Sequence, residues 1–567
     1  MTIRFRRRGA LSLLATAAAS SLLPSTKASA SVVDNLYGNR LLFTAAGHPL
    51  VPLGMMQGQK RVVVRARGGL VVEVGDVVVH VDGDTPVVID RVAGAAGVVR
   101  ELQVVETLEG ANRVKRKPVL LKWQTRGLVV RALDVGGVYG VKGTVVDNRA
   151  VLIVCDGPLP AGFEDARPVP LQWLEASPSA TIKASTPTSS PTGSMIRLRA
   201  KDGGSILVDK VEHSIGYADH GFEDRLLRDE VLIVPDKNGL LAVVNLVDEN
   251  VMVAGVLPSE MFASAPIEAL KAQAVTARGE LFAKIGRRHF ADPFLVCTEQ
   301  HCQVYRGQTA ESPKTNDAAR QTSGELAFLQ GHVVDSVYSA CCGGHTEPAE
   351  IVWDKPARPE LIGRADAPAT VELDHCKWLA RDVAAGFFVG AVVAGRIAQA
   401  PLIAAVLDTD AAVRAFLEQP RDAAWCGRSS FNQKGSAWRW ERRFSKADLD
   451  GTFADLGVGS VNRVVVDGRG PGGRLRALRV EGSTGTAKIL RELPVRKKLG
   501  NLRSGLFVVD EERDAAGALV AVVLRGAGFG HGSGMCQQGA IGMAEAGASY
   551  KDILAHAYNG AVVKRVF

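Results

Sequence analysis

The stretch VMVAGVLPSEMFASAPIEALKAQAVTAR, from Val251 to Arg278, joins an apolar run to a long amphipathic segment. The apolar run before Pro258 predicts a buried strand that ends at Pro258-Ser259-Glu260. From Pro266 to Ile285 the apolar residues recur at three- and four-residue steps, which predicts an amphipathic helix with proline in its first turn. A carboxylate, Glu260, therefore stands at a predicted strand-to-helix junction.

Glu260 has neighbours that favour acid chemistry. The amide dipoles of the following helix lie near it, and the apolar residues Met261 and Phe262 come directly after it. Burial among such residues raises the pKa of a carboxyl and keeps it a proton donor near neutral pH. Cleavage of a glycosidic bond is one reaction that needs such an acid. The alternative is a structural role, in which a glutamate in a first helical turn interacts with the helix dipole.

Length and composition predict an α+β protein of two or three units. The chain has 567 residues, of which 46% are hydrophobic and 23% charged, as in globular proteins. Glycine is abundant, at 60 residues, and only 6% of the residues are aromatic, which favours many short strands and tight turns. We therefore expect a β-rich N-terminal region, followed by a mixed α/β domain with a long helix after Glu260.

The pattern along the chain divides it into three segments after the N-terminus. Residues 32–175 contain short β-type runs, such as 61–65 and 75–81, separated by Gly and Asp turns, and we interpret them as a β-rich accessory region. Residues 176–194 are rich in Ser, Thr and Pro, which predicts a flexible linker. The segment 195–567 is the expected catalytic domain, and a short helix over 550–558 is predicted to end the chain.

The N-terminus has the pattern of an export signal. A basic run from Arg4 to Arg8 precedes a short apolar stretch and the small-residue pattern Ala28-Ser29-Ala30, which predicts a signal peptide over 1–30, and the pair Arg7-Arg8 is compatible with a twin-arginine type. We expect export to the periplasm or cell envelope and, after cleavage, no membrane span. Five of the eight excess positive charges lie in this segment, so charge gives little reason to expect a nucleic-acid partner.

Four stretches carry a resemblance to a known family. They are Val251 to Arg278, CQVYRG at Cys302–Gly307, YSACCGGHTE at Tyr338–Glu347, and GFGHGSGMCQQGA at Gly528–Ala540. In this order they resemble the SpoIID/LytB family of sporulation and cell-division wall proteins, with a weaker echo at 49–72. The resemblance covers about 221–567.

The resemblance implies a peptidoglycan lytic transglycosylase. Such enzymes cut between N-acetylmuramic acid and N-acetylglucosamine and leave a 1,6-anhydro end, so one carboxyl can act as acid and then as base. The family's catalytic glutamate lies in an SEM motif, which is Ser259-Glu260-Met261 here. Family enzymes prefer glycan strands stripped of peptide, which suggests work after an amidase. The alternative is a non-catalytic amidase enhancer that binds wall glycan and stimulates a partner hydrolase.

A group of histidines and cysteines is spaced like a metal site. Some family members hold zinc with one His and two Cys ahead of the CQ-Y motif, and the matching positions are His289, Cys297 and Cys302, with Cys341 and His345 in reserve. A disulfide between Cys297 and Cys302, or inert buried cysteines, are the alternatives. A zinc hydrolase is disfavoured because the chain has no HExxH pair.

Polar and glycine-rich positions near the motifs are candidates for sugar binding. The segment 526–534 lacks the Lys-Ser/Thr ending of a phosphate loop, so we expect no nucleotide cofactor. Glycine there instead lets the backbone approach a sugar chain, although tight turns around a buried histidine explain it equally well. The candidate substrate-binding residues are Lys271, Arg278, Ser339, Gly343, Gly344, His531, Gln537 and Gln538.

Several positions depart from the family pattern. Phe262 stands where proline is usual, Gly279-Glu280 replace a Ser or Thr and an aromatic residue, and Cys536 and Gln538 replace Ser and Tyr. These changes leave Glu260 intact. The stretch 367–436 is longer than usual for the family, and we expect an insertion there.

Overall fold

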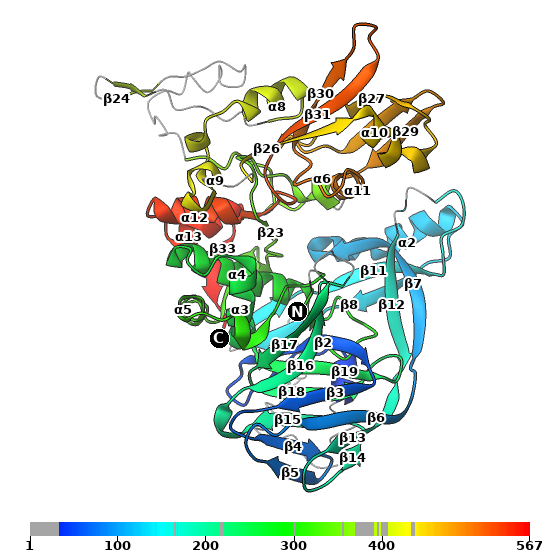
Figure 1. The fold of residues 1–567 in the computed structure, drawn as a ribbon, viewed down its shortest axis with the longest axis vertical. Coiled ribbons are helices and arrows are strands. Elements are labelled where there is room, and N and C mark those ends of the chain that lie inside the picture. The colour runs from blue at the N-terminus through cyan, green and yellow to red at the C-terminus, as the bar shows by residue number, and fades with distance from the viewer. Residues whose placement is uncertain are drawn as a thin grey trace, which may run out of the picture.

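The computed structural model describes residues 33–567, apart from 142, 164–165, 167, 216–219, 300, 354–355, 369–390, 394–395, 399–405 and 433–436. The predicted signal peptide lies outside the described residues, as does part of the predicted insertion. Figure 1 shows three tiers: β-sheets from the first half of the chain, a layer of helices in the middle, and β-sheets from the C-terminal part.

The first tier is built on an eight-stranded sheet of order β1-β2-β19-β18-β15-β4-β5, with β20 added beside β2. All neighbours are antiparallel except β2 and β20, which are parallel. The bounds are β1 Leu42–Phe43, β2 Pro49–Gln59, β4 Leu70–Val74, β5 Val77–Val81, β15 Ile196–Ala200, β18 Glu230–Pro235, β19 Leu241–Asp248 and β20 Val296–Cys297.

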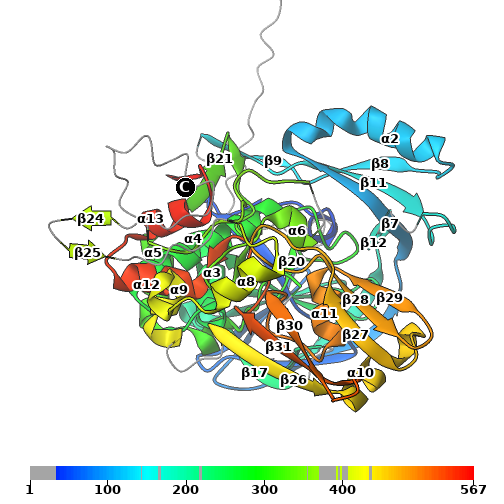
Figure 2. The ribbon, with the colours of Figure 1, turned by 90° about the horizontal axis from the view of Figure 1, so that it is seen from above.

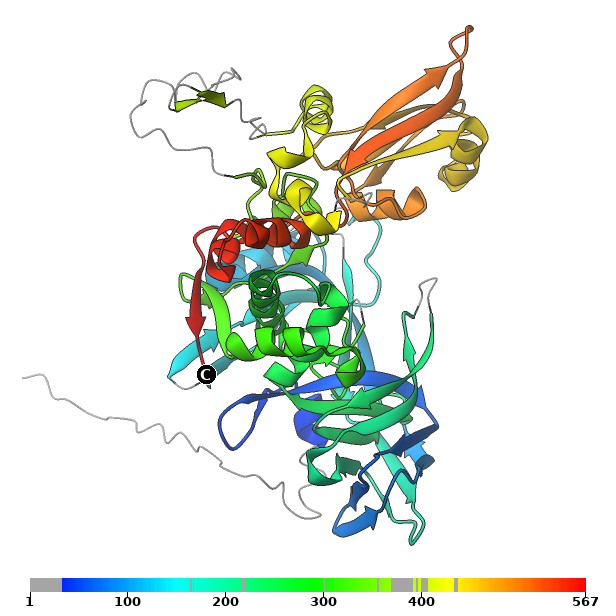
Figure 3. The same cartoon turned by 60° about the vertical axis from the view of Figure 1, so that its left-hand side comes forward.

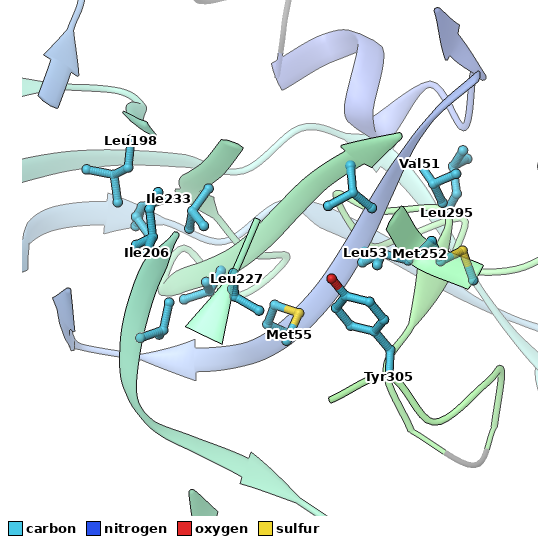
Figure 4. Close-up of a cluster of buried hydrophobic side chains, with 14 of the residues drawn as sticks. Val51, Leu53, Met55, Leu198, Ile206, Leu227, Ile233, Met252, Leu295 and Tyr305 are labelled. Carbon is cyan, nitrogen blue, oxygen red and sulfur yellow. The ribbon is translucent and has the colours of Figure 1, made fainter. Parts of the chain in front are cut away.

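A six-stranded antiparallel sheet of order β14-β13-β6-β3-β16-β17 shares a core with the first sheet. Alternate residues of the strands point into this core, as the period of two requires; Figure 4 shows Val51, Leu198, Ile206 and Tyr305 among its members. The bounds are β3 Arg61–Arg65, β6 Val87–Ala95, β13 Ser179–Ser185, β14 Thr192–Gly193, β16 Ile206–His213 and β17 Gly221–Leu227.

These two sheets correct the expected domain boundary. The predicted linker contains β13, which pairs with β6 along its whole length and buries Ile182 and Ala184. Strands from both sides of the linker also pair directly, β15 with β4 and β19 with β2. Composition misled here because alternating small and polar residues suffice for a strand whose partner is distant in sequence.

The segment from 98 to 176 forms a separate unit beside the sandwich. It is a four-stranded antiparallel sheet of order β12-β7-β11-β8 with one helix, and buried Trp123 and Ile153 belong to its core. A short hairpin, β9 and β10, follows β8. The bounds are β7 Val98–Glu109, α2 Arg116–Thr125, β8 Arg131–Val135, β9 Val138–Val141, β10 Thr144–Asp147, β11 Ala150–Asp156 and β12 Val169–Ala176.

The helical tier contains the stretch from Val251 to Arg278. The predicted helix is present as α4, Ile267–Lys284, whereas the predicted strand before it is the helix α3, Glu249–Glu260. Asp248 caps α3 by accepting a hydrogen bond from the backbone N–H of Asn250. Residues 252–257 are all buried, and a helix buried on every side shows no helical period in its sequence. That is why an apolar run with β-branched residues was mistaken for a strand.

Helices from the C-terminus pack on α4 (Figure 2). The chain ends with β33, which pairs with β21 beside the helices (Figure 3), so the predicted last helix is present but does not end the chain. The bounds are α5 Pro313–Gln321, β21 Glu325–Leu329, β22 His332–Val333, β23 Tyr338–Ser339, α6 Ala349–Trp353, β32 Met535–Cys536, α12 Gln537–Glu545, α13 Tyr550–Ala557 and β33 Val562–Arg565.

The third tier consists of two three-stranded antiparallel sheets, β26-β31-β30 and β27-β28-β29, around a core of their own. The bounds are α8 Asp410–Leu417, α9 Trp425–Arg428, β26 Arg439–Ser445, α10 Lys446–Thr452, β27 Val461–Val466, β28 Ala477–Gly482, β29 Thr486–Leu490, α11 Glu492–Lys498, β30 Phe507–Arg513 and β31 Leu519–Ala527. A two-stranded hairpin, β24 Ala391–Val393 and β25 Arg396–Ala398, lies within the predicted insertion.

The mixture of helices and many strands, with a β-rich N-terminal region, agrees with the predicted α+β class. Within the described part of the chain, every helix is too short or too polar to cross a membrane.

Candidate active site

A cleft of about 530 Å³ lies where the four motifs meet. It is bounded by the ends of α3 and α4, the loop after β20, the β23 segment, α6 and the loop before β32. Its lining residues are Ser259, Glu260, Glu280, Lys284, Arg288, Cys302, Gln303, Val304, Asp335, Val337, Tyr338, Ala349, Trp353, Arg358, Leu361 and His531. The fold thus brings together side chains that are up to 272 positions apart in the sequence, from Ser259 to His531.

Glu260 is the last residue of α3, and its side chain lines the cleft. Burial, together with the nearby carboxylate of Glu280, raises the pKa of Glu260 from 4.5 to about 7. The Tyr338 hydroxyl and the Val304 N–H donate hydrogen bonds to the Glu260 carboxylate and oppose part of this rise. The group is therefore about half protonated at neutral pH, which suits both donation and acceptance of a proton.

The main chain at Glu260 is held by the last motif. The side-chain amide of Gln537 donates to the Glu260 carbonyl at 2.7 Å and to the Gln273 side-chain oxygen at 3.2 Å. Gln537, a predicted substrate-binding residue, is largely buried in this position. Its observed contacts fix the end of α3 against α4 and do not reach into the cleft.

A second carboxylate, Glu280, enters the cleft from α4. It forms an ion pair with Lys284 and accepts a hydrogen bond at 3.0 Å from the Gln303 amide, which also donates to the Ala277 carbonyl at 2.9 Å. In the sequence, Glu280 stands out only as a departure from the family pattern. Its position in the sequence, two residues after Arg278 on the same predicted helix, places it on a different face of the helix from Arg278 but does not indicate a cleft.

Two rings form one wall of the cleft. The His531 and Trp353 rings lie 4.8 Å apart, centroid to centroid. The His531 Nδ1 accepts a hydrogen bond from the Ser533 N–H at 3.1 Å. Burial and the nearby Arg474 lower the pKa of His531 to about 3, so the ring is neutral. Of the predicted sugar-binding side chains, His531 is the one that lines the cleft, and neutral histidine and tryptophan suit a sugar face.

The N-terminal region reaches the edge of the cleft. Arg358, a lining residue, donates to Asp335 at 3.0 Å and to Glu109, at the end of β7, at 2.7 Å. Glu109 also pairs with Arg287, just after α4. The unit formed by residues 98–176 is therefore joined to the cleft through ion pairs, a link that sequence patterns did not reveal.

The predicted metal ligands His289, Cys297 and Cys302 lie together, and His301 joins them. All four ligand atoms lie within 4.8 Å of one another, and the His289 Nε2 lies 3.2 Å from the Cys302 Sγ. The other His289 nitrogen, Nδ1, lies 2.9 Å from Asp292 Oδ2, the carboxylate contact that commonly orients a metal-binding histidine. Two thiols and two imidazoles are a donor set that could hold a metal ion. Because Cys302 also lines the cleft, this group lies at its edge.

The reserve ligands lie elsewhere. The His345 Nδ1 contacts the carbonyl oxygen of Thr346 at 2.7 Å, and the Asn432 amide donates to the Cys341 Sγ at 3.7 Å, with both residues buried. Neither belongs to the group around His289.

Two predicted substrate-binding residues of α4 point away from the cleft lining. Arg278 has no exposed surface and donates to Glu249 at 2.6 Å in an ion pair that is also fully buried. Lys271 pairs with Glu268 at 2.7 Å. We therefore correct the expectation for Arg278, because its charge is already neutralised inside the protein and inaccessible to a carboxylate of the substrate.

The remaining predicted sugar contacts support the backbone behind the cleft. Ser339 is buried, and its hydroxyl accepts from the Gly532 N–H at 3.2 Å. Gly343 and Gly344 have φ values of +78° and +109°, and a Cβ on Gly343 would lie 2.6 Å from the Gly528 nitrogen. Gln538 accepts a hydrogen bond from Ser429 at 2.7 Å. Close packing between the two glycine-rich motifs explains Ser339 and Gly343, whereas Gly344 packs against Phe416 and Trp438 and Gln538 contacts Ser429.

This α+β chain, with a half-buried carboxyl of raised pKa in a cleft built from four motifs, is similar to the SpoIID/LytB family in the part that the comparisons match. Residues 237–328 match the family described as "Stage II sporulation protein", and residues 347–534 match a "Domain of unknown function (DUF8618)". The second match overlaps the third tier and the segment expected to be an insertion.

Named relatives agree with this assignment. The chain is 28% identical over 326 residues to the amidase enhancer of Bacillus subtilis. The matched region covers 54% of this chain and 39% of the relative. It is 23% identical over 322 residues to the stage II sporulation protein D of the same organism, and this match covers 54% of this chain and 72% of the relative. An uncharacterized protein of Brachyspira hyodysenteriae is 26% identical over 325 residues, a match that covers 57% of this chain and 68% of the relative.

Proposed function

We propose that the protein is a peptidoglycan lytic transglycosylase in which Glu260 is the general acid and base. The observation that carries the proposal is the pKa of about 7 for a carboxyl that lines the cleft. Protonated Glu260 donates its proton to the glycosidic oxygen between N-acetylmuramic acid and N-acetylglucosamine. The resulting carboxylate then takes the proton of the muramic 6-hydroxyl as that oxygen attacks the anomeric carbon. The product is a 1,6-anhydro end, and no water is consumed.

Because Glu280 is a second carboxylate in the cleft, its role decides whether the site acts as a lyase or as a hydrolase. A hydrolase uses a second carboxylate as nucleophile or to activate water. Glu280 is instead bound by Lys284 and Gln303, and its negative charge helps to keep the proton on Glu260. We assign Glu280 to positioning and pKa control, which leaves the chemistry to one carboxyl.

The proposed substrate is a glycan strand stripped of peptide, and the site of action is the cell envelope after export. The alternative is a non-catalytic regulator, since one relative is named an amidase enhancer. The group of His289, Cys297, His301 and Cys302 is proposed to bind zinc, which would brace the loop after β20 beside the cleft.

Purified protein incubated with peptide-free glycan strands tests the function. Mass spectrometry should detect anhydro-muramic ends from the parent protein and from a control, Glu418→Gln, whose side chain is 77% exposed and is not part of the cleft lining. Glu260→Gln should bind the strands without cutting them. Reducing ends would indicate a hydrolase, and an uncut polymer with parent protein would favour the regulator.

A further inference from the structure

A second group of metal-binding side chains lies inside the protein, apart from the cleft. It consists of Cys342, Asp366, Cys426 and Cys536, all buried, with their ligand atoms within 4.8 Å of one another. The four residues come from separate places: the motif after β23, the segment beyond α6, the helix α9, and β32. Among the described residues, this and the group around His289 are the two such groups.

The distances fit a tetrahedral ion. With Zn–S bonds of about 2.3 Å, two thiolate ligands of a tetrahedral zinc lie about 3.8 Å apart. The Cys342 and Cys426 sulfur atoms are 3.7 Å apart, and the Cys342 sulfur is 3.2 Å from Asp366 Oδ2. Three thiolates and one carboxylate complete four ligands, the usual number for a structural zinc site.

Surrounding groups orient these ligands. The Cys536 sulfur accepts backbone hydrogen bonds from Cys342 at 3.1 Å and Gly539 at 3.2 Å. The second oxygen of Asp366, Oδ1, lies 3.1 Å from the His556 Nε2 on α13. Hydrogen bonds of this kind to ligand sulfurs and carboxylates are what tune and fix a metal site.

We propose that Cys342, Asp366, Cys426 and Cys536 form a structural zinc site. The ion would bind the two glycine-rich motifs to the segment that contains α9, and thereby hold β32 against β23. Tyr338, on β23, and Gln537, next to Cys536, both contact Glu260. The site would therefore position the proposed catalytic residue without touching substrate. Nothing in this proposal depends on which reaction Glu260 performs.

The test measures zinc in the full chain by elemental mass spectrometry. To remove the other candidate site, the Cys297→Ser/Cys302→Ser double variant serves as the background and should retain about one zinc per chain. Adding Cys426→Ser or Asp366→Asn should remove this zinc. Cys341→Ser is the matched control, since Cys341 is a buried neighbouring thiol outside the group, and it should keep the ion.

A second measurement does not depend on the folding of variants. In the double-variant background, alkylation followed by peptide mapping should find Cys342, Cys426 and Cys536 as thiols that react only after a chelator is added. A disulfide between Cys342 and Cys426, or labelling that a chelator does not change, would overturn the proposal. So would a background protein without zinc, or zinc loss in Cys341→Ser but not in Asp366→Asn.

Discussion

Replacing Glu260 by glutamine should make the protein more stable at neutral and alkaline pH. The carboxyl has a pKa of about 7 in the folded protein and 4.5 as its ordinary value. Between these values the unfolded chain releases the proton while the folded protein retains it, so the folding free energy becomes less favourable as pH rises. This difference corresponds to about 3 kcal/mol of lost stability above pH 7. Below pH 4.5 both states bind the proton and the loss disappears.

Glutamine cannot ionise, so Glu260→Gln removes this pH-dependent cost. We expect similar melting temperatures for parent and variant at pH 4.5, and a gap in favour of the variant that grows to pH 7 and is constant above it. Thermal unfolding followed by circular dichroism at half-unit pH steps measures the gap. Glu418→Gln, at an exposed position, should follow the parent at every pH.

A Glu260→Gln variant that melts with the parent at pH 8 would refute the reasoning. It would mean that Glu260 ionises at its ordinary pKa, and the acid proposed for bond cleavage would then be unprotonated at neutral pH. A gap that is equally large at pH 4.5 and pH 8 would also contradict it, because such a difference would come from packing and not from ionisation.

Glycan cleavage should fall about tenfold per pH unit well above pH 7, because only protonated Glu260 can donate to the leaving oxygen. Glu280→Gln should move that fall to lower pH, since Glu280 helps to raise the pKa of Glu260, and an unmoved pH–rate profile would contradict this role. Trp353→Ala should raise KM for glycan strands by about tenfold with a smaller change in kcat, taking about 1–3 kcal/mol for a ring stacked on an aromatic side chain, as for bases; steady-state kinetics give the two values. Arg278→Ala should destabilise the protein by about 3–5 kcal/mol, because Glu249 would remain as a buried charge without its partner, and an unchanged melting temperature would contradict this.

Local patterns predicted the elements whose signal is periodic. The helix over 266–285 was predicted correctly because its larger apolar residues recur at three- and four-residue steps in the sequence, and the strand over 61–65 because its buried residues alternate. The helix α3 was missed because residues 251–257 are an apolar run that includes β-branched residues, which resembles a buried strand. The strand β13 was missed because its partner β6 lies about 90 residues earlier, and short-range composition carries no trace of that pairing.

For the candidate site too, the sequence indicated some residues and could not assign the roles of others. Motif residues indicated Glu260 and the histidine and cysteine group around His289, since their identities and spacing carry the chemistry. Sequence could not separate cleft residues from support residues, because α4 contributes Arg278 to the interior and Glu280 to the cleft only two positions apart. Rotation by about 200° between residues i and i+2 of a helix decides which of them meets substrate.

The sequence by itself showed the resemblance to the SpoIID/LytB family, one glutamate whose chemistry suits an acid, and thiols and imidazoles at metal-like spacing. Only the tertiary structure decided that Glu260 faces a cleft beside Glu280, that the predicted linker is a strand, and that Cys342, Asp366, Cys426 and Cys536 converge. The physical reason is that residue identity fixes what a group can do, whereas its pKa, its partners and its access to substrate depend on neighbours brought from distant parts of the chain.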